Sequence, residues 1–236
     1  MTETPTVVLV PGLLCDRTIF ERTLARLEPH LPCAVADVDS QTSIEEMAAD
    51  TLAAHPGPLY VLGHSMGARV AMEMAQQAPE RVKKLALADT GIHPYVEGEE
   101  VKRNARVKLA YDEGMAALAA DWLPGMVHPN RQNDAALMAP LAEMVCRKTP
   151  EIHERQINAL LTRPDARALL PTLTMPVLVA VGRQDQWSPL SRHEEMVALL
   201  PNAHLVVIED AGHFAPLERA GAFADAVEAW ALATDT

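Results

Sequence analysis

Residues 59–75 read L-Y-V-L-G-H-S-M-G-A-R-V-A-M-E-M-A, and this stretch decides the fold. A short apolar run leads into G-H-S-M-G (63–67), and an alanine-rich pattern typical of a helix follows. The pattern predicts a buried strand that turns sharply into a helix. Gly63 and Gly67 leave room for such a turn, because neither carries a side chain that would collide with the neighbouring backbone. We therefore expect Ser65 Oγ to be held out on a tight bend.

The residue after this serine would lie at the N-terminus of the helix. The backbone N–H of Met66 can donate there to a developing oxyanion, and the helix dipole favours negative charge at that end. A serine in the pattern G-x-S-x-G at a strand-to-helix junction is typical of a catalytic nucleophile. Ser65 is thus the candidate nucleophile, while we expect the adjacent His64 to pack beside the turn and not to catalyse.

Two later strand ends supply the partners that such a serine needs. The run P-V-L-V-A-V (176–181) predicts a strand that ends in a loop containing Asp185, and H-L-V-V-I-E (204–209) predicts one followed by His213. Sites in open α/β sheets form at the carboxyl ends of strands. A serine hydroxyl is a weak nucleophile until a base takes its proton, and a carboxylate must orient the histidine. These positions predict Asp185 as the acid and His213 as the base.

Two other aspartates compete for the acid role. Asp89 also follows a predicted strand, but the regular strand–helix alternation stops directly after it. Asp210 is only three residues before His213, which would require a tight local bend. Both positions are less favourable than that of Asp185.

Four motifs in the required order carry a family resemblance. They are V-V-L-V-P-G-L-L (7–14), G-H-S-M-G (63–67), G-R-Q-D-Q-W-S-P (182–189) and D-A-G-H-F-A-P-L-E (210–218). With these motifs the chain resembles the α/β-hydrolase superfamily over essentially its full length, and within it the small, capped serine esterases and lactonases.

The resemblance implies roles for particular residues. Ser65 corresponds to the nucleophile, Asp185 to the triad acid and His213 to the general base. The family's second oxyanion donor is a backbone N–H just after a His-Gly pair, which here reads Pro11-Gly12, so the matching donor is Leu13. The replacement of histidine by proline leaves this role intact, because the donor is an amide.

The resemblance and the alternation of strand-like and helical runs predict an α/β fold. We expect a mostly parallel central sheet of about six strands, with helices on both faces. From 91 to 171 no strand-like run occurs, and prolines interrupt the helical stretches. This segment predicts a helical cap inserted after the fourth strand, with residues 1–90 and 172–236 forming the core.

The expected elements can be bounded from the same patterns. Strands are expected at 6–10, 33–38, 59–63, 82–89, 176–181 and 204–209, and helices at 18–28, 44–54, 66–78 and 216–233.

The position of the cap predicts which residues meet a substrate. The insertion begins at the edge of the sheet that carries the candidate triad, so it would roof the site and exclude water. Trp122 and Met126 in the cap are candidate substrate contacts, together with Trp187 after the acid and Phe214 after the base.

Composition restricts the partners. The chain has 236 residues and a formal net charge of −12, which disfavours nucleic acid and gives no long-range attraction for anionic substrates. Its three cysteines and nine histidines show no metal-ligand spacing, and no phosphate- or dinucleotide-binding fingerprint is present. We expect no metal or cofactor. Without a signal segment or a membrane-spanning run, we expect a cytoplasmic protein. Monomer and homodimer both remain open.

These features favour a serine hydrolase that cleaves a carboxylic ester, thioester or lactone of a small molecule through an acyl-enzyme. A serine nucleophile argues against the dehalogenases and epoxide hydrolases of the same superfamily, which use aspartate. The first alternative is hydrolysis of a C–C bond in a β-diketone-like substrate. The second is a non-catalytic ligand receptor, because fold alone does not determine function.

Overall fold

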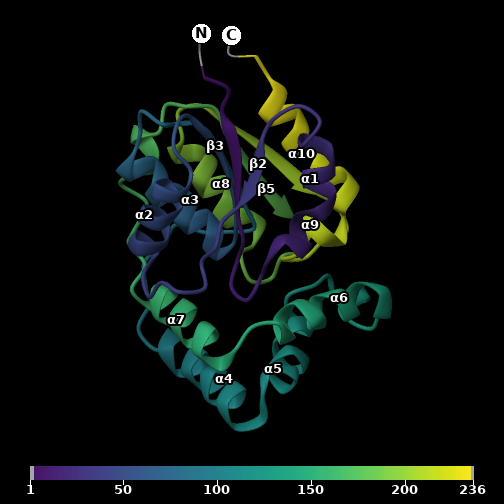
Figure 1. The fold of residues 1–236 in the computed structure, drawn as a ribbon. Helices are drawn as coiled ribbons and strands as arrows, with labels where there is room; N and C mark the ends of the chain where they lie inside the picture. The colour runs from purple at the N-terminus through teal and green to yellow at the C-terminus, as the bar shows by residue number, and fades with distance from the viewer. Residues whose placement is uncertain (1–2, 235–236) are drawn as a thin grey trace.

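Six parallel strands form the centre of the structure, a computed structural model that describes residues 3–234 (Figure 1). The strand order is β2-β1-β3-β4-β5-β6, and every neighbouring pair is parallel. The strands are β1 (Thr6–Val10), β2 (Cys33–Val35), β3 (Leu59–His64), β4 (Val82–Ala88), β5 (Val177–Gly182) and β6 (Ala203–Ile208). The predicted α/β sheet of about six strands is confirmed, and it is parallel throughout.

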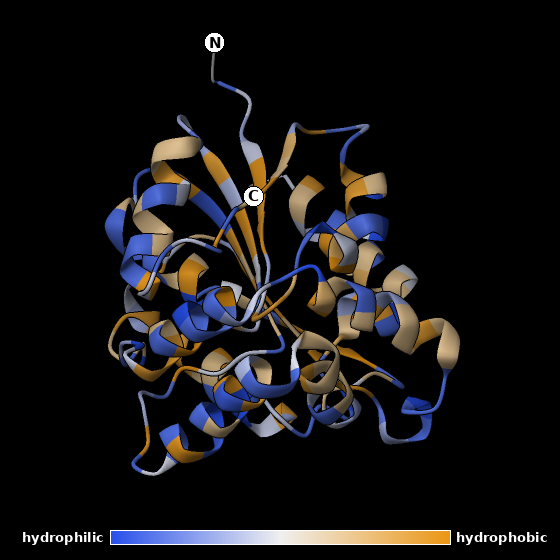
Figure 2. Cartoon of the chain, turned by 60° about the horizontal axis from the view of Figure 1, so that its bottom comes forward, coloured by the Kyte–Doolittle hydropathy of each residue, from blue (hydrophilic) through white to orange (hydrophobic). Residues whose placement is uncertain are grey.

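Helices cover both faces of this sheet (Figure 1). One face packs against α1 (Glu21–Leu27) and α10 (Ala220–Leu232), and the other against α2 (Ile44–Ala54), α3 (Met66–Gln77) and α8 (Leu190–Leu199). The two faces bury separate apolar layers, as expected for strands that are apolar on both sides. In Figure 2 the strands are largely orange, whereas the helices alternate between blue and orange.

Residues 91–171, which we call the helical segment, lie beyond the carboxyl ends of the strands and opposite the termini (Figure 1). The segment contains α4 (Glu99–Glu113), α5 (Met115–Trp122), α6 (Ala135–Cys146) and α7 (Pro150–Leu161). Short 3-10 turns lie at Leu123–Gly125, Pro129–Arg131 and Leu170–Thr172. Apolar side chains of the segment, such as Trp122 and Met144, join the core layer that includes Phe214. The segment is therefore packed onto the strand ends.

Five strands end within one residue of the expected positions, but β2 stops at Val35, three residues earlier than predicted. The side chain of Asp37 accepts a hydrogen bond from the backbone N–H of Asp39, 3.1 Å away. Such a bond offers the backbone an alternative to the strand ladder, and the chain turns away from the sheet.

Two predicted helices are each divided in two. The first consists of a 3-10 turn at Arg17–Phe20 followed by α1. The last consists of α9 (Ala215–Glu218) and α10, separated at Arg219, whose φ of −129° and ψ of 51° are not helical. The break turns Glu218 back toward the loop before it, where the residue takes part in the site described below.

None of the helices within residues 3–234 has the length and hydrophobicity required to span a lipid bilayer.

Candidate functional site

Ser65 occupies a strained turn between β3 and α3. Its φ of 53° and ψ of −114° lie in a region that residues with a side chain rarely adopt. The neighbouring strand end holds it there. The N–H of Ser65 donates to the carbonyl of Ala88 at 2.8 Å, and the hydroxyl of Thr90 donates to the carbonyl of Ser65 at 2.9 Å.

Glycines on both sides of the serine are required by close backbone contacts. A Cβ on Gly63 would lie 2.3 Å from the carbonyl oxygen of Gly67, and one on Gly67 would lie 2.0 Å from the carbonyl oxygen of Val10. Both distances are far below van der Waals contact. The glycines therefore allow the close backbone contacts of a sharp strand-to-helix turn, as the sequence pattern predicted.

The side chains of Ser65, His213 and Asp185 form a continuous hydrogen-bonded chain. His213 Nε2 lies 2.8 Å from Ser65 Oγ, and His213 Nδ1 lies 2.8 Å from Asp185 Oδ2. Because an ionised carboxylate only accepts, Nδ1 carries the proton, and the Nε2 lone pair is left to accept from the serine hydroxyl. The structure thus brings together three residues from three strand ends.

Asp185 is held as an ionised acceptor. Burial alone would raise its pKa, but the charge and hydrogen bond of His213 and the N–H groups of Ser188 and Trp187 outweigh burial and lower the pKa. Both N–H groups donate to Asp185 Oδ1 at 2.8 Å. The carboxylate therefore remains charged and fixed at neutral pH.

The two predicted oxyanion donors lie beside the serine. Met66 is the first residue of α3, so its N–H has no partner within the helix. Leu13 lines the same cavity as Ser65 and Met66. The preceding Gly12 packs directly on the turn, since a Cβ there would lie 3.2 Å from Ser65 Cβ.

Asp89 and Asp210 do not contact the ring of His213. Asp89 is fully buried, and its Oδ1 accepts from the N–H of Gly182 at 2.9 Å. Burial, reinforced by the charge of Asp185, raises the pKa of Asp89 well above its usual range and favours the neutral acid. The Asp210 side chain is exposed and paired with Arg219.

His64 contacts the backbone of the general base candidate, His213. Its Nε2 donates to the carbonyl oxygen of His213 at 2.7 Å. Burial lowers the pKa of His64 to about 3, so the ring is neutral at physiological pH. It stacks on Phe214 with ring centroids 5.7 Å apart. His64 therefore supports the turn and the loop that carries His213.

A cavity of about 880 Å³ opens over Ser65. Trp122 and Met126 of the helical segment line it, as does Trp187, which is 42% exposed. Phe214 does not line the cavity. It is only 1% exposed because its ring is packed against Trp122 and the rings of His64 and His213, so it belongs to the core.

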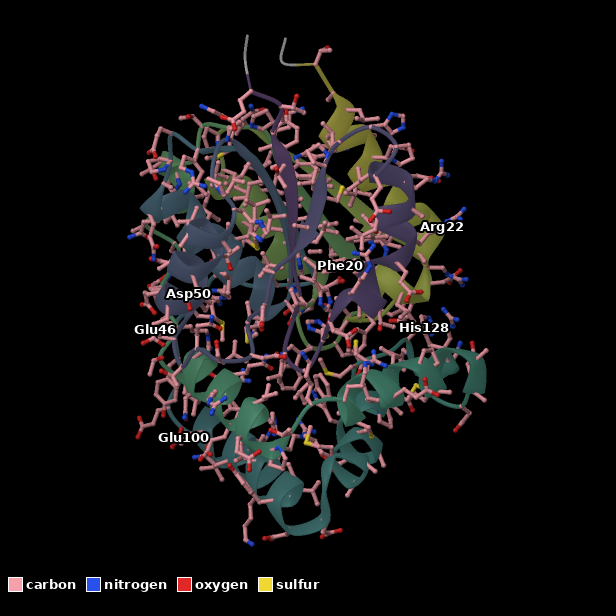
Figure 3. All side chains as sticks on the ribbon, in the orientation of Figure 1. Phe20, Arg22, Glu46, Asp50, Glu100 and His128 are labelled. Atoms are coloured by element: carbon pink, nitrogen blue, oxygen red, sulfur yellow. The ribbon has the colours of Figure 1, made fainter. Side chains whose placement is uncertain are left out.

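Sequence reasoning missed a carboxyl that holds the loop of His213. The two oxygens of Glu218 accept from the N–H groups of Gly212 and His128, each at 2.8 Å. The sequence has no signal for this contact, since it depends on the break at Arg219. His128 itself lies at the boundary between the helical segment and the core (Figure 3).

A second missed residue is Arg69, which lines the cavity together with Ser65. It comes four residues after Ser65, and residues at this spacing share one face of a helix. The spacing was therefore a usable signal for placing Arg69 at the site.

Comparisons with known proteins agree with this geometry. Residues 7–226 match the model of the alpha/beta hydrolase family. A pimeloyl-[acyl-carrier protein] methyl ester esterase of Neisseria meningitidis serogroup C is 28% identical over 216 residues, which covers 86% of this chain and 84% of that protein.

Among solved structures, a malate-bound thermophilic esterase from Thermogutta terrifontis superposes with a TM-score of 0.87 and 27% identity, over 98% of this chain and 90% of that one. The enol-lactonase of Burkholderia xenovorans LB400 shares the fold, with a TM-score of 0.85 and 23% identity over 98% of this chain and 92% of that one. Because the family model spans nearly the whole chain, the protein belongs to the alpha/beta hydrolase family and is an enzyme of that fold.

Proposed function

We propose that the protein hydrolyses a carboxylic ester, thioester or lactone of a small molecule through an acyl-enzyme on Ser65. The hydrogen-bonded chain from Ser65 through His213 to Asp185 carries this proposal. The hydroxyl of Ser65, which lies in a strained turn, faces the unprotonated Nε2 of His213, and Ser65 lines the cavity.

Acylation follows from these positions. His213 Nε2 takes the hydroxyl proton as Ser65 Oγ attacks the carbonyl carbon of the substrate. The carbonyl oxygen becomes an oxyanion, which the N–H groups of Leu13 and Met66 stabilise with the dipole of α3. When the tetrahedral intermediate collapses, the protonated His213 gives its proton to the leaving alcohol, thiol or enol. The acyl group stays on Ser65.

Deacylation repeats the same steps with water. His213 takes a proton from a water molecule that attacks the acyl carbon, and the second oxyanion uses the same two amides. Collapse breaks the bond to Ser65 Oγ, which regains its proton from His213. Asp185 stabilises the imidazolium in both halves of the cycle.

The helical segment serves in this proposal as a cap on a core made of residues 1–90 and 172–236. It covers the strand ends, supplies Trp122 and Met126 to the cavity wall and limits the access of water to the acyl-enzyme. Ester and lactone hydrolysis is favoured over C–C bond hydrolysis because the similar proteins are named as esterases and a lactonase.

Turnover of p-nitrophenyl acetate and butyrate by the purified chain tests the proposal. We expect steady hydrolysis by the wild type, stoichiometric labelling of Ser65 by a fluorophosphonate, and a loss of about 10⁶-fold in kcat for Ser65→Ala. Wild-type rates in Ser65→Ala would refute the assignment. Ligand binding without any turnover would favour the receptor interpretation.

A further inference from the structure

The cavity wall carries more positive than negative side chains, although the chain as a whole has a net charge of −12. Six lining residues are arginine or lysine, and two are acidic, Glu99 and Asp121. Both carboxylates are already paired. Glu99 binds Arg103 and Arg163, and Asp121 binds Arg106. Half of the lining cations therefore have no carboxylate to balance them.

The unbalanced cations are Arg69, Lys102 and Arg192. Within residues 3–234, the side chains of Lys102 and Arg192 form no hydrogen bond or ion pair, but both residues are exposed and water can solvate the side chains. Arg69 differs, because only 8% of it is exposed. An unpaired charge with so little access to water is costly to maintain.

The polar partners of Arg69 are uncharged. Its Nη2 donates to the carbonyl of His93 at 2.7 Å and its Nη1 to the carbonyl of Pro164 at 3.3 Å. A guanidinium has five N–H donors, so these bonds leave three unused. The carboxylates whose charges stabilise the Arg69 cation are Glu99 and Asp165, and both are paired elsewhere, Glu99 with Arg103 and Arg163 and Asp165 with Arg167.

Arg69 remains a cation at neutral pH. Burial, together with the positive charges of Arg163 and Arg192, lowers its pKa to about 9, which still leaves it protonated at pH 7. A bound anion would offset the burial and the repulsion from these two cations.

Arg69 and Arg192 line the same cavity as the nucleophile Ser65. Arg69 is one helical turn after Ser65 on the same face of α3. Arg192 packs on Gly91, where a Cβ would lie 3.6 Å from Arg192 Nη1. The two side chains therefore flank residues 91–93, where the chain leaves β4 for the helical segment.

We propose that the substrate is an ester or lactone whose non-reacting part carries a carboxylate or phosphate group, and that Arg69, assisted by Arg192, binds this anion. The proposal rests on the proposed hydrolase function. The planar guanidinium fork suits both kinds of anion, and a cleft of low dielectric concentrates the local field despite the opposite net charge of the chain. The net charge of −12 gives no long-range attraction for anions, but this proposal places a local attraction for them at the site.

The competing interpretation is purely structural. Because Arg69 bonds to the carbonyls of His93 and Pro164, it also ties together the two ends of the helical segment. A structural tie would affect all substrates equally, whereas an anion subsite would affect charged substrates selectively. Selectivity is therefore the decisive measurement.

The experiment compares matched esters at a fixed ionic strength of about 0.15 M, where distant exposed charges are largely screened. Methanol release is measured for monomethyl esters of linear dicarboxylic acids and for methyl esters of monocarboxylic acids of equal length. A second series carries a terminal phosphate. The readout is the ratio of kcat/KM for the charged ester to that for the neutral ester within each variant, so a general loss of activity cancels.

We expect the wild type to prefer the charged ester by at least about tenfold, the effect of one charge-assisted hydrogen bond. Arg69→Met should remove most of this preference, Arg69→Lys should retain part of it, and Arg192→Met should reduce it. Arg22→Gln is the control, because Arg22 points outward from α1, away from the helical segment (Figure 3). A preference for either anion supports the proposal, and the larger one identifies the source.

A wild-type ratio of one or less with both anions would overturn the subsite, as would a ratio unchanged in both Arg69→Met and Arg192→Met. Calorimetric titration of the charged ester into Ser65→Ala, with and without Arg69→Met, measures binding without turnover. We expect at least about tenfold weaker binding in the double variant, and equal binding would overturn the subsite. A chain that hydrolyses no ester would refute the proposed function, while this titration would still test the anion site.

Discussion

Gln156 on helix α7 accepts a hydrogen bond at its Oε1 from the backbone N–H of Leu14, across 2.8 Å. Its Nε2 donates to the carbonyl of Val38 at 3.1 Å and to Asp39 Oδ1 at 3.2 Å. Gln156 is fully buried, and Leu14 has a φ of 58°, which a leucine rarely adopts. The helical segment thus fixes the loop that carries the proposed oxyanion donor Leu13.

Substitution of Gln156 should therefore affect the reaction itself. Gln156→Leu leaves the N–H of Leu14 without a partner and frees the neighbouring amide of Leu13 to turn. Loss of one oxyanion donor costs about 10²–10³ in kcat, so a misplaced donor should cost about 10–100-fold, with a smaller change in KM. Steady-state kinetics on a p-nitrophenyl ester measure both constants.

The control for this variant is Asn158→Leu, an exposed position on the same helix. It should retain wild-type kcat. If Gln156→Leu lost stability to urea but kept its kcat, the residue would be a packing residue without influence on the oxyanion site.

The three aspartates near the base should respond very differently to substitution by asparagine. Asp185→Asn should lower kcat by about 10⁴, because the amide favours the wrong tautomer of His213. Asp89→Asn should cost far less, since burial raises the pKa of Asp89 and an amide resembles the neutral acid. The exposed Asp210 should also tolerate asparagine. If Asp89→Asn lost activity while Asp185→Asn kept it, the triad acid would be Asp89, at the end of β4.

The sequence was sufficient for the parts of the fold that rest on local chemistry. Apolar runs located five strands to within one residue, and paired glycines located the turn at Ser65. Because the carboxyl ends of parallel strands meet at one edge of a sheet, Asp185 and His213 could then be placed together. The early end of β2 was not predictable from hydropathy, because a side-chain bond of Asp37 competes with the strand ladder.

Contacts between distant segments could not be predicted in the same way. Gln156 and Leu14 are 142 residues apart, and nothing in either local pattern indicates the bond between them. Hydropathy also fails to separate a core aromatic from one that lines a cavity. Phe214 and Trp122 are both buried and in edge-to-face contact, yet only Trp122 reaches the cavity.

Trp122 and Met126 should control which acyl chains are accepted. Trp122→Ala or Met126→Ala enlarges the cavity, so longer chains should gain relative to acetate. One lost contact is worth about 1–3 kcal/mol of discrimination, or about 10–200-fold. Relative kcat/KM values for a C2–C8 series of p-nitrophenyl esters measure the shift, and a general loss of activity cancels in each ratio.

Tyr111→Ala is the matched control for the cavity variants. Tyr111 is an exposed aromatic residue on α4 that does not line the cavity. Its profile should follow that of the wild type. Unchanged profiles for both Trp122→Ala and Met126→Ala would mean that the helical segment does not select the acyl chain.

His153 should make stability depend on pH. Burial, together with the positive charges of Arg106 and Arg103, lowers its pKa to about 4, whereas the unfolded chain has the ordinary value of about 6.5. Between these values the unfolded state binds more protons, so the stability that the neutral ring contributes is complete above about pH 6.5 and is lost as the pH falls toward 4. Other groups titrate in this range, so the difference between the wild type and a variant isolates the effect.

The free energy of unfolding in urea should be compared for the wild type and His153→Leu at pH 7.5 and pH 5.0. The advantage of the wild type should be smaller at pH 5.0 by about 1–2 kcal/mol, because leucine cannot take up a proton. Ile157→Val, a buried change on the same helix, should cost about 0.5–1.5 kcal/mol at both pH values. An equal difference at the two pH values for His153→Leu would mean that the imidazole is already solvated in the folded chain. It would also mean that the positive charges of Arg106 and Arg103 do not lower the pKa of His153 in the folded chain.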